Sequence, residues 1–305
     1  MKVIGITGGT GFIGKHLTAL LVKQGYQVVV FSRNPKKNNA TANVSYASWD
    51  PENEKIDTAS IMKLTGIVHL AGAGIADKRW TPERKKELTD SRVKTTASLV
   101  SQLKAYAPHC HTMIAASATG FYGPDRAGVS PFTEDSPAYD DFLGKLCVAW
   151  ENEEHKAEEM MRTVILRFGI VLGRESGAFN EFEKPMHFGI MPILGNGKQM
   201  VSWIEVDDLC RMILFSLESE RVNGIYNAVS PEPVSNKTMM RSIAKLMGGI
   251  KIPVYAPAFM IKLLFGELST EVLKSVTAKA DKIVNTGFEF QYDSIDKAVG
   301  AILKS

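Results

Sequence analysis

VIGITGGTGFIG, the stretch at residues 3–14, decides the fold of this chain. Its first five residues predict a short buried strand, and glycines follow at positions 8, 11 and 14. Apolar residues then recur at helical spacing up to Leu21, and residues 28–31 form a second strand. This is a β-turn-α-β unit, whose glycine turn lets a pyrophosphate reach the amide groups at the start of the helix.

The residues after the second strand indicate which dinucleotide binds. A carboxylate at this point would accept the ribose 2′-hydroxyl of NAD. This chain instead has the run SRNPKK at residues 32–37, with no carboxylate. The hydroxyl of Ser32 and the guanidinium of Arg33 suit a 2′-phosphate, so the sequence predicts NADP rather than NAD.

The strand and helix rhythm continues along the chain. Strands are predicted at residues 67–70, 112–116, 163–167 and 225–229, and helices at 82–103 and 150–161 and from Asp207 onward. This alternation predicts an α/β fold with a Rossmann-type, doubly wound parallel sheet and a smaller, mainly helical C-terminal lobe. We expect residues 1–172 to form the NADP-binding domain, with 201–230 returning to it, and residues 173–200 and 231–305 to form a substrate-facing lobe.

Composition excludes several classes of function. The 305 residues hold 36 Lys and Arg and 33 Asp and Glu, a net charge of +3 without a long basic run, so nucleic acid is not an expected partner. Apolar runs are only strand-length and the glycine loop begins at once, so neither a membrane span nor a signal peptide is expected. Three widely spaced cysteines favour reduced thiols and a cytoplasmic location. We expect no metal site, because residues 109–111 (HCH) have no second ligand pair nearby.

Five segments together resemble one large family of proteins. They are TGGTGFIG, HLAGAGIADKRW, SATGFYG, RFGIVLG and GNGKQMVSWIEVDDL. The chain is similar to the extended short-chain dehydrogenase/reductase superfamily, and most of all to its epimerase-like branch, the NAD-dependent epimerase/dehydratases. Residues 265–267 and 286–290 of the tail resemble the same branch, so the likeness covers essentially the whole chain.

The resemblance implies a set of cofactor contacts. The pyrophosphate would be held by the loop, and Ser32 and Arg33 would take the 2′-phosphate. Leu70 and Ala71 would line the adenosine side. The long helix would also reach the cofactor, and one residue after the fifth predicted strand would lie near the nicotinamide. The remaining implied contacts are Gly8, Thr10, Gly11, Phe12 and Ile13 of the loop, Glu87 and Arg92 of the helix, and Val171 near the nicotinamide.

The chain departs from its relatives at the catalytic positions. Typical members use a Tyr-x-x-x-Lys pair with an upstream serine, and this sequence contains no Tyr-x-x-x-Lys. Ser117 remains, and three possibilities stay open. Tyr122 could supply the proton while Ser117 orients the substrate; Asp141 could act as the acid/base beside Lys145; or the chain could lack fast hydride chemistry altogether.

Two functions follow from these observations. The first is an NADP-dependent oxidoreductase or epimerase-like enzyme that moves a hydride to or from a carbinol or carbonyl carbon of a small polar substrate. The second is a non-catalytic NADP(H)-binding regulator or redox sensor, motivated by the missing tyrosine. We expect a monomer or a homodimer.

Overall fold

The computed structural model describes residues 2–37, 40–174 and 177–304. Its largest element is an eight-stranded sheet with the strand order β12-β7-β6-β5-β1-β2-β3-β4. Every neighbouring pair is parallel except β3 and β4. The strands are β1 Val3–Thr7, β2 Gln27–Ser32, β3 Val44–Asp50, β4 Lys55–Ile56, β5 Gly66–His69, β6 Thr112–Ala118, β7 Arg162–Phe168 and β12 Gly224–Ala228. The doubly wound parallel sheet predicted from the sequence is confirmed.

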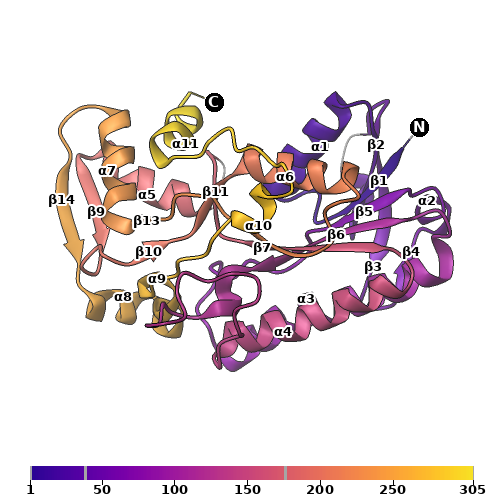
Figure 1. Cartoon of the computed structure of the whole chain (residues 1–305), viewed down its shortest axis with the longest axis horizontal. Helices are drawn as coiled ribbons and strands as arrows, with labels where there is room; N and C mark the ends of the chain where they lie inside the picture. The colour runs from indigo at the N-terminus through magenta and orange to yellow at the C-terminus, as the bar shows by residue number, and fades with distance from the viewer. Residues whose placement is uncertain (1, 38–39, 175–176, 305) are drawn as a thin grey trace.

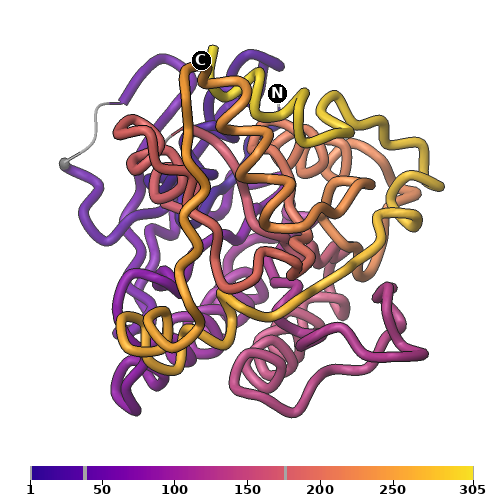
Figure 2. Tube along the Cα trace, turned by 90° about the vertical axis from the view of Figure 1, so that its left-hand side faces the viewer, coloured from indigo at the N-terminus to yellow at the C-terminus, as the bar shows by residue number. Residues whose placement is uncertain are grey.

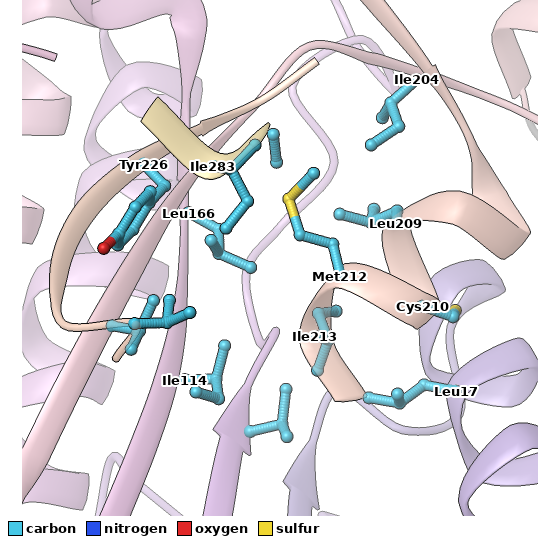
Figure 3. Packing of buried hydrophobic residues seen from close by; sticks show 14 of the residues in the cluster. Leu17, Ile114, Leu166, Ile204, Leu209, Cys210, Met212, Ile213, Tyr226 and Ile283 are labelled. Atoms are coloured by element: carbon cyan, nitrogen blue, oxygen red, sulfur yellow. The ribbon is translucent and has the colours of Figure 1, made fainter. Parts of the chain in front are cut away.

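Helices cover both faces of this sheet (Figure 1). On one face lie α1 (Phe12–Lys23) and α6 (Val206–Glu218), and on the other lie α2 (Thr58–Ile61), α3 (Pro82–Tyr106) and α4 (Phe142–His155). Figure 3 shows Leu17 of α1 and Ile213 of α6 near Ile114 of the sheet, all within one buried cluster. Because both faces are covered, the central strands are nearly continuous runs of buried residues.

The chain reverses its direction of travel across the sheet between β1 and β5. From β1 it passes outward to β2 and β3, and it then returns to β5 on the other side of β1. In open α/β sheets, ligands bind outside the carboxyl ends of the strands at such a reversal. The glycine loop after β1 and the segment after β5 meet at this point.

The smaller lobe lies at the far end of the molecule from α2 and β4 (Figure 1). Its own core contains Trp203, Phe179 and Met239. Its helices are α5 Gly177–His187, α7 Asn236–Met247, α8 Ala258–Phe265, α9 Ser269–Leu273 and α11 Ile295–Ile302. The short helix α10 Asp281–Val284 instead packs against β12 of the large sheet. Short strand pairs complete it: β8 Ile170–Leu172 with β11 Trp203–Glu205, β10 Met200–Val201 with β13 Val234–Ser235, and β9 Ile190–Leu194 with β14 Ile252–Ala256.

Residues 201–230 divide between these two parts. β12 joins the large sheet beside β7, whereas β11 pairs with β8 outside that sheet. No helix in the described part of the chain is both long and apolar enough to cross a membrane. Single 3₁₀ turns fill several connections: η1 Pro35–Lys37, η2 Thr119–Tyr122, η3 Lys156–Glu159 and η4 Gly266–Leu268.

One predicted helix is wrong in its bounds. The sequence predicts a helix over residues 150–161, but α4 begins at Phe142 and ends at His155. Asp141 caps it, because its side chain accepts a hydrogen bond from the amide of Gly144 at 2.8 Å. The segment that aligns with the catalytic stretch of the superfamily is therefore the first turn of a helix.

A strap of residues 274–280 ties the lobe to the large domain. Asp125 accepts hydrogen bonds from the Ser275 hydroxyl and from the Thr277 amide, both at 2.8 Å. Backbone bonds join Phe132 to Thr277 and to Lys279. The strap therefore fixes the position of the lobe relative to the large sheet.

Gly14 offers a sharp test of packing at the start of α1. A Cβ at this position would overlap the Cα of Gly9, whereas a Cβ at Gly300, inside α11, would meet nothing within 4 Å. We expect Gly14→Ala to lower the free energy of unfolding by about 1–3 kcal/mol. The same change at Gly300 should raise it by about 0.5–1 kcal/mol, because alanine favours helix interiors. Denaturant titration of both variants measures the two effects, and equal effects would contradict this account.

Candidate functional site

The glycine loop presents bare backbone at the start of α1. Gly8 has a φ of +71°, and a Cβ there would lie 2.8 Å from the carbonyl oxygen of Leu70. Gly11 is the first residue before the helix, with extended backbone and no side-chain cap, and the first turn contains no acidic residue. The amide groups of this turn and the helix dipole therefore favour an anion.

The segment after β5 forms the second wall of the site. Leu70 and Ala71 lie against Gly8, and the Leu70 amide donates to the carbonyl of Thr7 at 3.1 Å. The two strand ends are thus in direct contact. Only a glycine at position 8 permits this approach, because any side chain would displace the neighbouring backbone.

Ser32 and Arg33 lie where β2 ends. Ser32 is half-buried and its hydroxyl accepts a bond from the amide of Asn34 at 3.2 Å, while Arg33 is exposed. β2 is the neighbour of β1 in the sheet, so both residues stand at the same edge as the glycine loop. A free guanidinium at this edge has the charge that a 2′-phosphate requires.

Phe12 and Val171 lie on the lobe side of the loop. The Phe12 ring packs close to Gly173, which follows β8, and a Cβ on Gly173 would collide with that ring. Val171 is half-buried within β8. Thr10 is exposed in the loop and Ile13 is half-buried on α1. The predicted loop contacts therefore share one region of the structure.

The two predicted contacts on α3 differ from one another. Glu87 is exposed and pairs with Arg84 at 2.7 Å. Arg92 is buried: it donates to the carbonyl of Ala73 at 3.0 Å and its guanidinium lies 5.1 Å from the ring of Trp150. Burial lowers the pKa of Arg92 to about 10. Arg92 thus supports the loop after β5 from behind.

His69 connects the two strand ends to the helices beneath them. Its Nδ1 lies 2.6 Å from the hydroxyl of Thr7, and its Nε2 lies 2.9 Å from the hydroxyl of Thr96 on α3. Trp150 of α4 donates to the same Thr96 oxygen at 3.1 Å. Burial, aided by the positive charge of Arg92, lowers the pKa of His69 to about 4. The imidazole is therefore neutral at physiological pH, and it anchors the last residue before the glycine loop.

Ser117 faces the interior, which differs from its expected role beside the substrate. Its hydroxyl donates to Glu151 at 2.5 Å, and Arg167 donates to both oxygens of that carboxylate at 2.9 and 2.7 Å. Ser117 is only 2% exposed. Its hydroxyl is thus engaged in a buried ion pair.

Tyr122 is also enclosed. Its hydroxyl donates to the Asn227 side-chain oxygen at 2.6 Å and accepts a bond from Arg167 at 2.9 Å, and its ring stacks on Phe132. The residue has no exposed surface. Burial raises the pKa of Tyr122 to about 12, although Arg167 opposes this shift. A phenol held in this way is poorly placed to exchange a proton with a substrate, so the geometry does not support the expected acid/base role.

Asp141 and Lys145 do not form the predicted pair. Asp141 caps α4 and lies 3.7 Å from the ammonium of Lys274 in the strap. Lys145 is largely exposed and pairs with Asp140 at 2.7 Å. Asp141 therefore has a structural role at the helix start, and Lys145 lies on the surface.

Sequence reasoning missed Glu151, Glu154 and Arg167. Glu154 is fully buried, and neither of its oxygens has a hydrogen-bond partner in the described residues. Burial, together with the negative charge of Glu151, raises its pKa well above the usual value. The sequence does contain one signal for their burial. Glu151 and Glu154 are three residues apart, and they share the helical spacing of the apolar residues of α4. The described residues contain no cluster of three metal-ligating side chains.

The fold and the glycine loop define a Rossmann-type protein, and the comparisons give its family. The model of the NAD dependent epimerase/dehydratase family matches residues 4–228, and a domain of unknown function, DUF1731, matches residues 256–302. The chain belongs to the NAD-dependent epimerase/dehydratase family, which confirms the resemblance.

Two relatives of similar length and one longer protein support this assignment. An epimerase family protein of Bacillus subtilis, YfhF, is 34% identical over 98% of this chain and 97% of its own. The human epimerase family protein SDR39U1, solved with NADPH, superposes with a TM-score of 0.87 at 26% identity, covering 99% of both chains. A nucleoside-diphosphate sugar epimerase from Corynebacterium glutamicum has a TM-score of 0.78 at 28% identity, with 99% of this chain and 58% of that one covered.

The buried His69 predicts acid sensitivity. Its pKa is about 4 in the folded protein and 6.5 in its unperturbed state, so between these values only the unfolded chain takes up the proton. The stability that neutral His69 contributes is complete above pH 6.5 and is lost as the pH falls through 4. Between pH 7 and 4.5, wild type should lose roughly 2 kcal/mol more than His69→Gln. Chemical unfolding at both pH values tests this, with the exposed His187→Gln as control. Identical pH profiles for wild type and His69→Gln would refute it.

Proposed function

We propose that this protein binds NADP(H) at the carboxyl ends of β1, β2 and β5. The observation that carries the proposal is the glycine cradle: Cβ atoms at Gly8 and Gly14 would meet backbone, and α1 begins without a side-chain cap. Gly8, Thr10, Gly11, Phe12 and Ile13 would hold the pyrophosphate. The human relative solved with NADPH supports the same reading.

The preference for NADP over NAD is assigned to the end of β2. Arg33 is exposed there, and Ser32 lies beside it with a hydroxyl at the same edge. Leu70 and Ala71 would border the adenosine, and Val171 would border the nicotinamide end. Some structural neighbours are solved with NAD, so the choice depends on this chain's own residues.

The activity that we infer is hydride transfer on a small polar substrate. When bound, the cofactor supplies or accepts the hydride at its nicotinamide. This chain's residues would bind and orient the two molecules, with the lobe enclosing the substrate. Epimerases of nucleoside-diphosphate sugars among the relatives make a sugar nucleotide one substrate class to test.

A second candidate function is a cofactor-binding regulator without turnover. It is favoured because all four expected catalytic side chains are bonded to other groups of the protein. Ser117 and Tyr122 are buried in the network around Arg167. Asp141 caps α4, and Lys145 pairs with Asp140. Under this alternative the glycine loop and Arg33 keep their roles.

Replacing Arg33 tests the cofactor assignment. Arg33→Ala should weaken NADPH binding by about tenfold or more and leave NADH binding nearly unchanged, because it removes one charge-assisted contact to the 2′-phosphate. Titration calorimetry with both nucleotides measures this, and Arg241→Ala, an exposed arginine of α7, is the matched control. Unchanged discrimination between NADPH and NADH would exclude the role of Arg33.

A substrate screen separates the enzyme from the regulator. NADPH absorbance is followed with sugar nucleotides, aldehydes and quinones after NADPH binding has been shown. We expect oxidation with at least one class, because the family is one of cofactor-dependent enzymes. Stoichiometric NADPH binding without turnover in any class would favour the regulator.

A further inference from the structure

The small sheet of the lobe has one apolar face that nothing in the described chain covers. β9 and β14 are parallel neighbours, with Ile190 opposite Ile252 and Met191 opposite Pro253. Met191 belongs to the lobe core, so Ile252 and Val254, which alternate with Pro253, face the other way. Both are exposed. The outward face of a half-buried sheet is usually polar, and here it is not.

The helix that follows β14 continues this apolar surface. α8 reads AFMIKLLF, and only Ile261 is buried in it. Phe259 and Leu263 are 70% and 74% exposed, and Met260 and Leu264 lie beside them. At ~100° per residue these four side chains form one stripe along the helix. Figure 2, which looks onto this end of the molecule, shows β14 at the front with α8 at its lower end.

The charges within residues 249–265 have a single sign, and the nearest acidic side chain in the sequence, Glu267, is paired with Lys85. Between Gly248 and Gly266 the only charged residues are Lys251 and Lys262. Lys262 follows Ile261 on α8 and so borders the exposed stripe. An apolar stripe flanked by lysine is typical of helices that lie in the interface of a bilayer, where the lysine reaches the headgroups.

Two features disfavour a second copy of this chain as the occupant. The amide of Ile252 bonds to β9, so alternate residues, including Pro253, face the open edge of β14. Proline has no amide hydrogen to donate there, and this blunts the edge against another strand. A two-fold contact would also place a surface with only positive charge against itself.

We propose that the surface formed by β14 and α8, here named the β14–α8 face, docks on an anionic lipid bilayer. Phe259, Met260, Leu263 and Leu264 enter the boundary between headgroups and acyl chains. Lys251 and Lys262 contact the anionic headgroups. The protein binds peripherally, which agrees with the lack of a spanning helix in the described residues. This inference does not rest on the proposed function, because none of the residues assigned to the cofactor lies on β14 or α8.

Vesicle sedimentation tests the proposal with the full chain. Phosphatidylcholine vesicles are used with and without phosphatidylglycerol, and bound protein is measured against lipid concentration. Wild type should bind far better when phosphatidylglycerol is present. Leu263→Asp and Met260→Asp should weaken binding at least tenfold. Met62→Asp, at a methionine that is equally exposed on the large domain, is the matched control and should bind like wild type.

The lysines provide an independent measurement. Each of Lys251→Gln and Lys262→Gln should weaken binding about fivefold, and added salt should weaken wild type as well. Circular dichroism and NADPH titration confirm that every variant is folded. Lack of wild-type binding to either vesicle overturns the proposal, as does equal binding with and without phosphatidylglycerol. A dimer in sedimentation equilibrium that Leu263→Asp dissociates, without vesicle binding, assigns the face to a second copy instead.

Discussion

The close contact between the glycine loop and the end of β5 is the constraint on which the site depends. Gly8 approaches the backbone of Leu70 and Ala71, and Gly14 lets α1 begin directly over Gly9. If side chains at Gly8 and Gly14 prevented these close contacts, the first turn of α1 could not lie at the carboxyl ends of β1 and β5. His69 extends the same constraint inward, since it links Thr7 before the loop to Thr96 on α3. The glycine loop is therefore held in place by backbone packing and one buried imidazole.

The interior beside β6 contains a buried network of charged and polar side chains. Glu151 would be costly to bury alone, and the two hydrogen bonds from Arg167 offset that cost. Although burial alone would lower it, the pKa of Arg167 is raised by this carboxylate. Glu154 has no such partner among the described residues, and burial raises its pKa well above the usual value. The hydroxyls of Ser117 and Tyr122 complete this network, which explains why neither is presented to a substrate.

The sequence predicts the sheet well and the catalytic geometry poorly, for a physical reason. β1, β2, β5, β6, β7 and β12 are recognisable because their buried runs and glycine turns are local patterns. The orientation of Ser117 depends on Glu151 and Arg167, which are distant in sequence and meet only in the folded chain. One of the three alternatives that the sequence leaves open makes Asp141 an acid/base. A carboxylate before a helix is also an ordinary cap, however, and α4 starts there.

In the lobe, apolar side chains that form the core can be told apart from apolar side chains that stay exposed. Met191 and Ile193 of β9 are buried against Met239 and Ile243, so the inner face of the small sheet is satisfied. Ile252, Val254 and the stripe on α8 have equal apolar character and no cover, although polar side chains there would cost the lobe nothing. Lys237 lies over the Tyr255 ring on the inner side, so the outer side is free of its charge. Core formation thus accounts for the inner face of β9, whereas Ile252 and Val254 of β14 and the stripe on α8 are left exposed.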